Sequence, residues 1–286
     1  MSFSSIETSR HRGQPVTLYH FAYSETAYFA YTDAENPITH DENGSASGGE
    51  IIYEPIPIMR EAVVSSGTMD KSALSIRMPR DVELGDLFRV YPPAQVVTLI
   101  IRQGHLSDTE DPPEFLVIWS GRVLSVARDG DECVVSCEPV SSSLRRPGLR
   151  RHYQFGCPHV LYGPQCNANK ATHSITTTVS ALSGTSITLP SGWNGSFSAA
   201  KFVEGVVEWT NDAGGIERRK ILKVTGNVLL LGGLLRDLDV GATITAALGC
   251  NHQMSDCQNL FANIQNFGGC PWIPTENPIG PRNNYY

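Results

Sequence analysis

Short segments in which apolar and polar residues alternate recur through the first half of the chain and predict β-strands. They cover residues 17–23, 27–31, 51–54, 74–78, 96–103 and 115–126. Alternation places successive side chains on opposite faces of a sheet, so each segment offers one face to a core. An Asp129-Gly130 turn before the apolar run at 132–140 predicts a β-hairpin. Residues 32–49 are polar and rich in turn-forming residues, and we expect an exposed loop there.

A second group of alternating segments lies between residues 172 and 248. Turn signals at 183–184, 211–215 and 225–227 separate these segments and predict a small sandwich or barrel of about five strands. One helix is predicted, at 256–267. Ser255 is its expected N-cap, and its apolar face is formed by Cys257, Leu260, Ile264 and Phe267.

The whole pattern predicts a mainly β chain in three parts. A β-rich N-terminal domain covers residues 1–147, and a small inserted β-sandwich or barrel covers residues 172–248. Residues 148–171 and 249–286 flank the insertion and form the third part, which carries the short C-terminal helix. The 26 glycines and 18 prolines, with only 18% charged residues, suit short strands and turns better than long surface helices.

Charge and cysteine usage narrow the classes of function. The formal net charge of -7 argues against a dedicated nucleic-acid binder, which usually carries a basic stripe. We find no secretory signal and no apolar run long enough to span a bilayer, so we expect the protein to be made and assembled in a reducing cytoplasm. Seven cysteines, an odd number, then favour metal ligation with spare thiols over a disulfide framework.

Four cysteines form two pairs at the ends of one segment. Cys157 and Cys166 frame the string CPHVLYGPQC, Cys250 and Cys257 frame CNHQMSDC, and residues 167–249 contain no cysteine. The pairs can meet if the inserted module returns the chain to its starting point. A tight turn at 162–164 would direct both sulfurs of the first pair to one centre. The helix dipole would favour the thiolate form of Cys257. These residues therefore predict a four-cysteine metal site.

The spacing within the pairs leaves the occupant open. Eight residues separate the first two cysteines and six the second two, whereas structural zinc sites usually use pairs two to four residues apart. An iron–sulfur cluster is larger and can be wrapped by wider loops, although ferredoxin spacings do not match either. His159 or His252 could replace one cysteine as a ligand, or could hydrogen-bond locally. Alternatively, the cysteines are unrelated and some are buried as small apolar residues.

The other three cysteines have different settings. Cys133 and Cys137 share one face of a predicted strand, roughly 13 Å apart, which is too far to share a metal, so we expect core packing. Cys270 lies beside Pro271 in a loop. It is interpreted as a spare thiol, with a role as a fifth ligand left open.

No catalytic constellation is apparent, and we do not predict an enzyme. There is no P-loop, GxGxxG or HExxH pattern, and no nucleophile context suggests a hydrolase. The basic run at 145–152 could contact phosphates, form a solvated linker or offset the negative charge of a cluster. In the inserted domain and the first cysteine loop, Trp193, Trp209 and Tyr162 could stack on a host sugar or simply pack.

The two cysteine strings, followed by a helix and by Phe267-Gly268-Gly269-Cys270-Pro271, resemble the tail-tip hub proteins of long, flexible-tailed bacteriophages and the related hub of gene transfer agents. In lambda-type tail-tip proteins, similarly spaced pairs hold an iron–sulfur cluster of the four-iron type. The resemblance implies that Cys157, Cys166, Cys250 and Cys257 are the ligands here. The insertion is longer than in lambda-type members, and Cys270 stands where an aromatic residue is expected.

The resemblance also implies a structural role. It predicts a baseplate hub in the virion tail, active in tail assembly and genome delivery. The hub would be a homotrimeric ring that joins the distal tail protein to the central, receptor-binding tail-tip protein. The cluster would tie the two loops together. Two alternatives use the same cysteines, namely an iron–sulfur redox or electron-transfer protein and a zinc-containing binding module.

Overall fold

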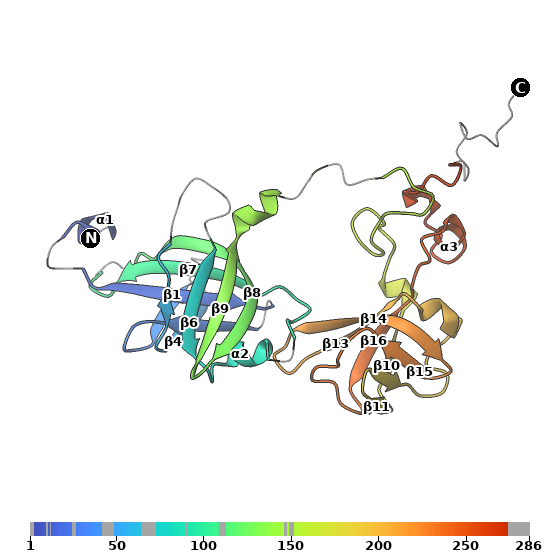
Figure 1. The fold of residues 1–286 in the computed structure, drawn as a ribbon, viewed down its shortest axis with the longest axis horizontal. Helices are drawn as coiled ribbons and strands as arrows, with labels where there is room; N and C mark the ends of the chain where they lie inside the picture. Colours follow the sequence, from blue (N-terminus) through green and yellow to red (C-terminus); the bar gives the residue numbers. More distant parts are fainter. Residues whose placement is uncertain are drawn as a thin grey trace, which may run out of the picture. The chain divides into compact units, whose positions relative to one another are not determined.

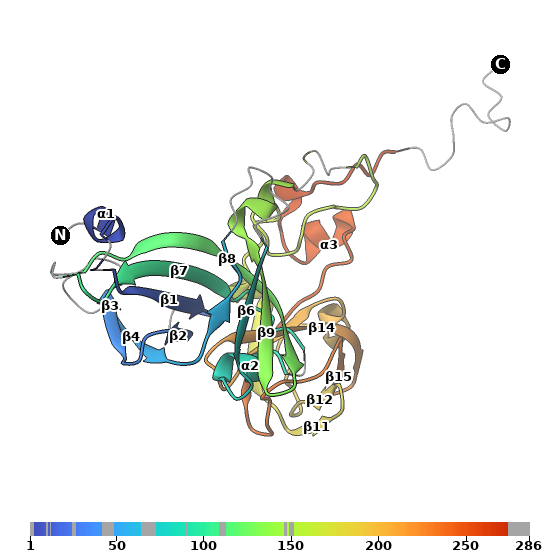
Figure 2. The same ribbon diagram turned by 60° about the vertical axis from the view of Figure 1, so that its left-hand side comes forward.

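The computed structural model describes residues 3–9, 11, 13–24, 27–41, 49–63, 73–89, 91–108, 113–145, 148 and 152–273. The chain forms two compact units, one of residues 1–146 with 212–215 and the other of residues 147–211 with 216–286 (Figures 1 and 2). Both units are built on β-sheets, so the mainly β prediction is confirmed. Within the described residues, no helix is long and apolar enough to cross a membrane.

The first unit holds a nine-stranded sheet in the order β3-β4-β2-β1-β7-β8-β9-β6-β5. Neighbouring strands are antiparallel except β2 and β4, which run parallel. The strands are β1 Pro15–Ala22, β2 Tyr28–Thr32, β3 Ile38–Asp41, β4 Glu50–Pro55, β5 Met59–Arg60, β6 Leu74–Pro79, β7 Thr98–His105, β8 Leu116–Asp129 and β9 Glu132–Pro139. Two short helices accompany them, α1 Phe3–Glu7 and α2 Glu83–Leu87.

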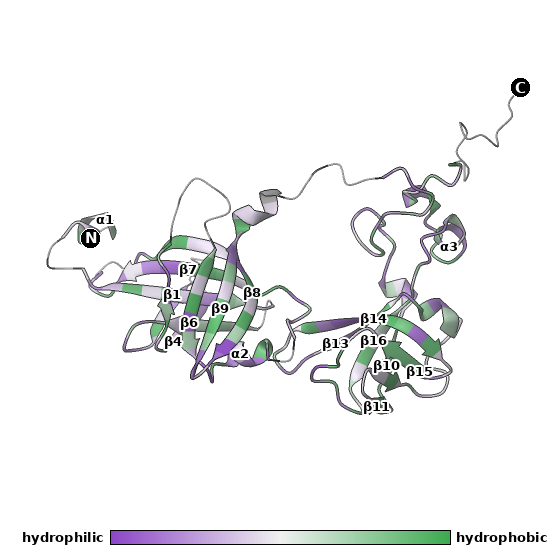
Figure 3. Ribbon diagram, viewed as in Figure 1, coloured by the Kyte–Doolittle hydropathy of each residue, from purple (hydrophilic) through white to green (hydrophobic). Residues whose placement is uncertain are grey.

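Alternation of burial along the strands explains this sheet. In β6 and β9 every second side chain is buried, among them Ile76, Met78 and Val135, and together they form one apolar core. Figure 3 shows apolar residues concentrated in the strands and polar residues in many of the connecting loops. The predicted hairpin is confirmed, because Asp129 pairs with Glu132 across a two-residue turn in which Gly130 has a φ of +60°.

The loop expected over residues 32–49 is partly wrong. Ile38–Asp41 forms strand β3, which pairs with β4 in the register Ile38↔Tyr53 to Asp41↔Glu50. Ile38 packs against the buried Tyr53, so one apolar contact and a full backbone ladder make a strand from a mostly polar sequence. Residues 42–48 lie outside the described residues. The two-residue strand β5 was not predicted either, because a segment this short carries no periodicity.

The second unit contains a seven-stranded antiparallel sheet in the order β10-β16-β13-β14-β15-β12-β11. Its strands are β10 Ser174–Thr178, β11 Ala181–Ser183, β12 Ser186–Thr188, β13 Val206–Thr210, β14 Ile216–Thr225, β15 Val228–Leu231 and β16 Thr243–Ala247. The two end strands, β10 and β11, follow each other in the chain, so the sheet curls back towards its own start. The prediction of about five strands was too low, because β11 and β12 have only three residues each.

The core of this sheet contains both tryptophans considered as sugar contacts. Trp193 is 4% exposed and Trp209 is 3% exposed, and both pack with Phe202, Val207 and Ile221. The indole N–H of Trp209 donates to the carbonyl oxygen of Arg236 at 2.8 Å. Neither ring therefore offers a face to a sugar, and of the two interpretations packing is correct for these residues.

The helix expected over residues 256–267 is shorter and begins earlier. Helix α3 spans Met254–Asn259, and a separate 3-10 turn follows at Ile264–Asn266. Ala262 has a φ of +47°, which ends the helical path between the two. The N-cap is Gln253, not Ser255, and its side chain makes no capping hydrogen bond. The apolar residues whose spacing suggested one long helix instead lie in or next to two short elements, helix α3 and the 3-10 turn that follows it.

The cysteine-bearing segments and the second sheet belong to one compact unit. Residues 152–170 and 249–273 lie side by side at one end of that sheet (Figures 1 and 2). The further division of this unit into an inserted domain at 172–248 and a cysteine part stays a prediction.

Candidate metal centre

The first cysteine loop is folded back by a tight turn at residues 160–163. The N–H of Gly163 donates to the carbonyl oxygen of Val160 at 3.0 Å, and Tyr162 has a φ of +60°. A positive φ at the third position is the mark of a type II turn. The N–H of Asn167 then donates to Gly163 at 2.7 Å. A turn is therefore present two residues earlier than the predicted 162–164, and it directs the chain from Cys157 back to Cys166.

The second cysteine loop leaves strand β16 at a point where the backbone of residues 247–249 passes very close to that of residues 203–205. A Cβ at Gly249 would lie 1.9 Å from the carbonyl oxygen of Val203, and a Cβ at Gly205 would lie 2.2 Å from that of Ala247. Only glycine fits such an approach. The N–H of Gly249 donates to Lys201 at 2.8 Å, which fixes the point where the loop to Cys250 begins.

Helix α3, which carries Cys257, is anchored by an ion pair to the insertion. The ammonium of Lys201, in the 3-10 turn Ala199–Phe202, lies 2.8 Å from a carboxylate oxygen of Asp256. The side chain of Asp256 is only 12% exposed. A carboxylate this buried needs a partner, so Lys201 positions the helix and with it the thiol of Cys257.

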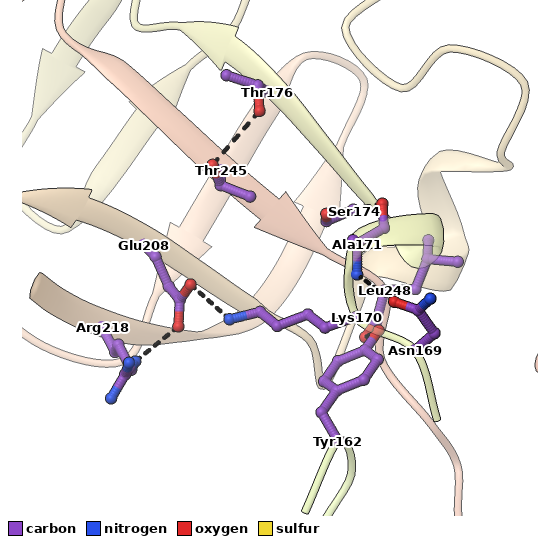
Figure 4. Close-up of polar contacts among 10 residues, drawn as sticks. All are labelled: Tyr162, Asn169, Lys170, Ala171, Ser174, Thr176, Glu208, Arg218, Thr245 and Leu248. Carbon is purple, nitrogen blue, oxygen red and sulfur yellow. Dashed lines mark hydrogen bonds and ion pairs between the residues drawn. The ribbon is translucent and has the colours of Figure 1, made fainter. Parts of the chain in front are cut away.

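Hydrogen bonds join the two cysteine loops directly. The N–H of Cys157 donates to the carbonyl oxygen of His252 at 2.8 Å, and Nδ1 of His252 donates to the carbonyl oxygen of Cys157 at 2.9 Å. The hydroxyl of Tyr162 donates to the carbonyl oxygen of Leu248 at 2.9 Å (Figure 4). Segments about ninety residues apart in the sequence thus meet through reciprocal bonds.

Three of the four sulfurs lie near N–H groups, and the fourth thiol donates to a carbonyl. The N–H of His252 points to Sγ of Cys250 at 3.3 Å, and that of Gly268 to Sγ of Cys157 at 3.4 Å. Nδ2 of Asn263 lies 3.7 Å from Sγ of Cys166, while the thiol of Cys257 donates to the carbonyl oxygen of Asn263 at 3.1 Å. N–H donors aimed at sulfur stabilise the electron-rich thiolate form and tune the potential of a bound cluster.

All four cysteines line one small cavity of about 20 Å³, together with His159, His252 and Asn263. Neighbouring groups also affect the ionisation of Cys250 and Cys257. Burial, and after it the charges of Cys157, Cys166 and Cys250, raise the pKa of Cys257 to about 11. Burial is the main cause of the raised pKa of Cys250, with Asp256, Cys166 and Cys157 adding to it. Four thiolates in so small a space need a cation to offset their repulsion.

The expectation that the helix dipole favours the thiolate of Cys257 is wrong. The pKa of this thiol is raised, because burial and three neighbouring sulfurs outweigh any effect of a helix only six residues long. Throughout the part of the chain that the structure describes, no group of three or more His, Cys, Asp or Glu side chains is arranged to hold a single metal ion. The cysteines share a cavity without converging on one point.

The C-terminal motif packs against the first cysteine loop. A Cβ at Gly268 would lie 2.5 Å from Nε2 of His159, so the imidazole occupies the space that a side chain would fill. His159 is buried, and its Nδ1 donates to the carbonyl oxygen of Asn266 at 3.0 Å. The N–H of Cys270 donates to Gln154 at 2.8 Å. Glycine at position 268 is thus explained by close packing.

The remaining candidates fall outside the cavity. Cys270 is partly exposed and is not among the residues that line it. Cys133 and Cys137 are buried in the core of the first sheet, as predicted. Most of the basic run at 145–152 lies outside the described residues. Sequence reasoning missed Asn263, which contacts both Cys166 and Cys257, because a single asparagine beyond a helix carries no recognisable motif.

Three comparisons with known proteins bear on this arrangement. A family described as "Phage conserved hypothetical protein BR0599" matches residues 200–277, which include Cys250 and Cys257. A Xylella fastidiosa (strain 9a5c) protein named "Uncharacterized protein" is 27% identical over 197 residues, covering 64% of this chain. The match spans only 38% of that relative, well under half of its length.

A solved structure gives the widest coverage. A chain of the "Virion of native gene transfer agent (GTA) particle" superposes with a TM-score of 0.79, covering 96% of this chain and 93% of that chain, at 18% sequence identity. At this identity the likeness establishes a shared fold over nearly the full length.

Proposed function

We propose that this protein is a structural component of a phage-type virion tail, namely a baseplate hub whose two cysteine loops are held together by an iron–sulfur cluster. The observation that carries the proposal is that Cys157, Cys166, Cys250 and Cys257, from two distant segments, line one cavity. The phage family that matches residues 200–277 and the fold shared with a gene transfer agent virion chain support the virion part.

The donor set fits such a cluster. Four thiolates are the usual ligands of a four-iron cluster, and N–H groups near the sulfurs are the usual outer contacts. A tetrahedral zinc ion with Zn–S bonds of about 2.3 Å would draw four sulfurs to roughly 3.8 Å from one another. The described donors are not gathered about one point in this way. The wide spacing within the two pairs, with eight and six intervening residues, is what favours the larger group over zinc.

The cluster would supply a covalent tie between loops that the chain itself joins by hydrogen bonds and by side-chain packing, such as that of Tyr162 against Phe261. The chain's own residues orient the loops. The reciprocal bonds of Cys157 with His252 align the backbones, and Lys201 holds α3 through Asp256. In the hub proposal this tie rigidifies one end of the second sheet. A homotrimeric ring and contacts with the distal tail protein and the central tail-tip protein extend the proposal and rest on the family resemblance.

Anaerobic purification of the full chain, followed by iron, sulfide and zinc assays, tests the cofactor. We expect a brown protein with about four iron and four sulfide per chain. A colourless protein, or one with stoichiometric zinc, would contradict the cluster and favour the zinc module. Reversible reduction coupled to turnover of a substrate would favour the redox alternative.

The hub role needs a separate measurement. Negative-stain electron microscopy and light scattering of the purified chain should show rings whose mass is three times 31.2 kDa. Mixing with the distal tail protein of the same particle should give a larger, stable complex. If the purified chain by itself stays monomeric even at high concentration, the ring is contradicted.

A further inference from the structure

A second, larger pocket opens beside the cysteine cavity. Its volume is about 430 Å³, within the range of small-molecule sites. The first cysteine loop forms one wall through Pro158, Val160 and Leu161. The opposite side is formed by the start of β13 and by Arg218 and Lys220 of β14. Cys250 and His252 line both this pocket and the cysteine cavity.

The backbone around this pocket is held in an unusual conformation. Among the described residues, six that are not glycine have positive φ, and three of these line the pocket. They are Tyr162 at +60°, Glu204 at +67° and His252 at +59°. Such conformations cost about 1 kcal/mol or more each and cluster at functional sites. The concentration of three in one pocket indicates a site whose shape is maintained at a cost in stability.

The charges at the rim favour an anion. Lys220 pairs with Glu204, and the side chains of both are about half exposed. An exposed pair of this kind contributes little stability, so the ammonium can exchange its partner for a ligand. Arg218 lies 2.6 Å from Glu208, which also binds Lys170 (Figure 4). The three charged side chains that line the pocket, Glu204, Arg218 and Lys220, carry a net positive charge of one.

The wall formed by the first cysteine loop is apolar and open to solvent. Val160 is 77% exposed and lines the pocket together with Leu161. An exposed apolar wall facing two cations suits a ligand with an apolar body and an anionic head. We propose that this pocket binds a small amphiphilic anion, such as an aromatic sulfonate or a medium-chain carboxylate. The proposal does not depend on the iron–sulfur cluster, because its binding groups are Val160, Arg218 and Lys220.

Calorimetric titration of the purified full chain with 1-anilinonaphthalene-8-sulfonate tests this proposal. We expect saturable one-site binding that Lys220→Gln weakens about fivefold, as loss of one exposed charge contact should. Val160→Asp should weaken it further, because a carboxylate would then face the anion. Lys223→Gln and Val240→Asp, at exposed positions that do not line the pocket, should bind as the wild type does.

Competition identifies the chemistry of the ligand. Octanoate should displace the probe, whereas 1-octanol, which lacks the charge, should not. Absence of binding, or equal effects of the pocket variants and their controls, would overturn the site. Equal displacement by octanol and octanoate would overturn the anionic character. Because the iron and sulfide content is measured on the same samples, failure here is distinguishable from failure of the cluster.

Discussion

The chain places cysteines in two contrasting settings. Cys133 and Cys137 lie on strand β9 inside the core of the first sheet, and burial raises the pKa of Cys137 to about 12. Cys157, Cys166, Cys250 and Cys257 lie on loops and a short helix of the second unit and line one cavity, where burial and neighbouring thiols raise the pKa values of Cys250 and Cys257. Among the residues that the structure describes, N–H groups from distant segments are directed at sulfur only in the second set.

The contrast teaches that the setting of a cysteine decides its chemistry. A strand fixes a thiol among apolar side chains and spaces it too far from its neighbour to share a ligand. Loops with positive-φ turns can bring sulfurs from remote segments to one place, here with Tyr162 and His252 at the turns. In the proposed hub, ligation of a cluster would offset the cost of gathering four ionisable thiols.

The largest expected effect comes from replacing one of the four cysteines that line the cavity. Cys250→Ser should abolish the visible absorption and the bound iron, and it should lower the stability of the second unit by several kcal/mol, because ligation is coupled to folding. Cys157→Ser should do the same. Absorption spectra, iron assays and chemical denaturation measure these changes.

Cys270→Ser is the matched control, since Cys270 is a partly exposed loop cysteine of the same unit outside the cavity. It should retain full iron content. Equal loss of iron in Cys270→Ser and Cys250→Ser would remove the distinction between the two residues and bring Cys270 into the site.

The next effect concerns the two cysteines in the core of the first sheet, Cys133 and Cys137. Cys137→Ser would bury a hydroxyl group in an apolar core and should lower the free energy of unfolding by about 1–3 kcal/mol. Cys137→Ala should cost less, because it adds no polar group. Urea denaturation monitors the stability, and the iron content should be unchanged in both variants. Loss of iron from either would show that the two sets of cysteines are not independent.

A smaller effect is expected at the anchor of α3. Lys201→Gln leaves the buried carboxylate of Asp256 without its cation and should destabilise the protein by about 1–2 kcal/mol. Combining it with Asp256→Asn should recover part of that loss, because no buried charge then remains. Thermal denaturation of the three variants measures the coupling. Strictly additive losses would mean that the ion pair does not hold the helix.

The smallest expected effect comes from replacing Glu208 of strand β13, and it depends on pH. Burial alone would raise the pKa of Glu208, but hydrogen bonds and charges from Lys170 and Arg218 hold it below its usual 4.5 (Figure 4). A lowered carboxyl pKa contributes stability above the unfolded pKa, and this is lost as pH falls through the folded pKa. Glu208→Gln should therefore cost about 1 kcal/mol at neutral pH and almost nothing well below pH 4.5. A difference that persists in acid would contradict the lowered pKa.

Much of the fold followed from alternation and turn residues. The strands around Ile76, Leu99 and Val135 were predicted from their alternating apolar residues, and in the strands of Ile76 and Val135 every second side chain is buried. Strand β3 was missed because its sequence, Ile-Thr-His-Asp, has a single strongly apolar residue and depends on pairing with β4. The helix was drawn too long, because apolar spacing does not reveal the left-handed Ala262.

The site was partly predictable for similar reasons. Cysteine spacing indicated which four residues belong together, and the structure places all four along one cavity. The residues that organise the cavity were not predictable. Asn263 and the pair of Lys201 with Asp256 act through contacts between distant segments, and nothing in local sequence marks such contacts.

X-ray absorption at the iron and zinc edges of the anaerobically purified full chain tests the central claim most directly. The account predicts iron surrounded by sulfur, with further iron atoms nearby, and this signal should disappear in Cys157→Ser and in Cys250→Ser alike. Zinc alone at full occupancy, or no metal in a folded protein with all four thiols reduced, would contradict it.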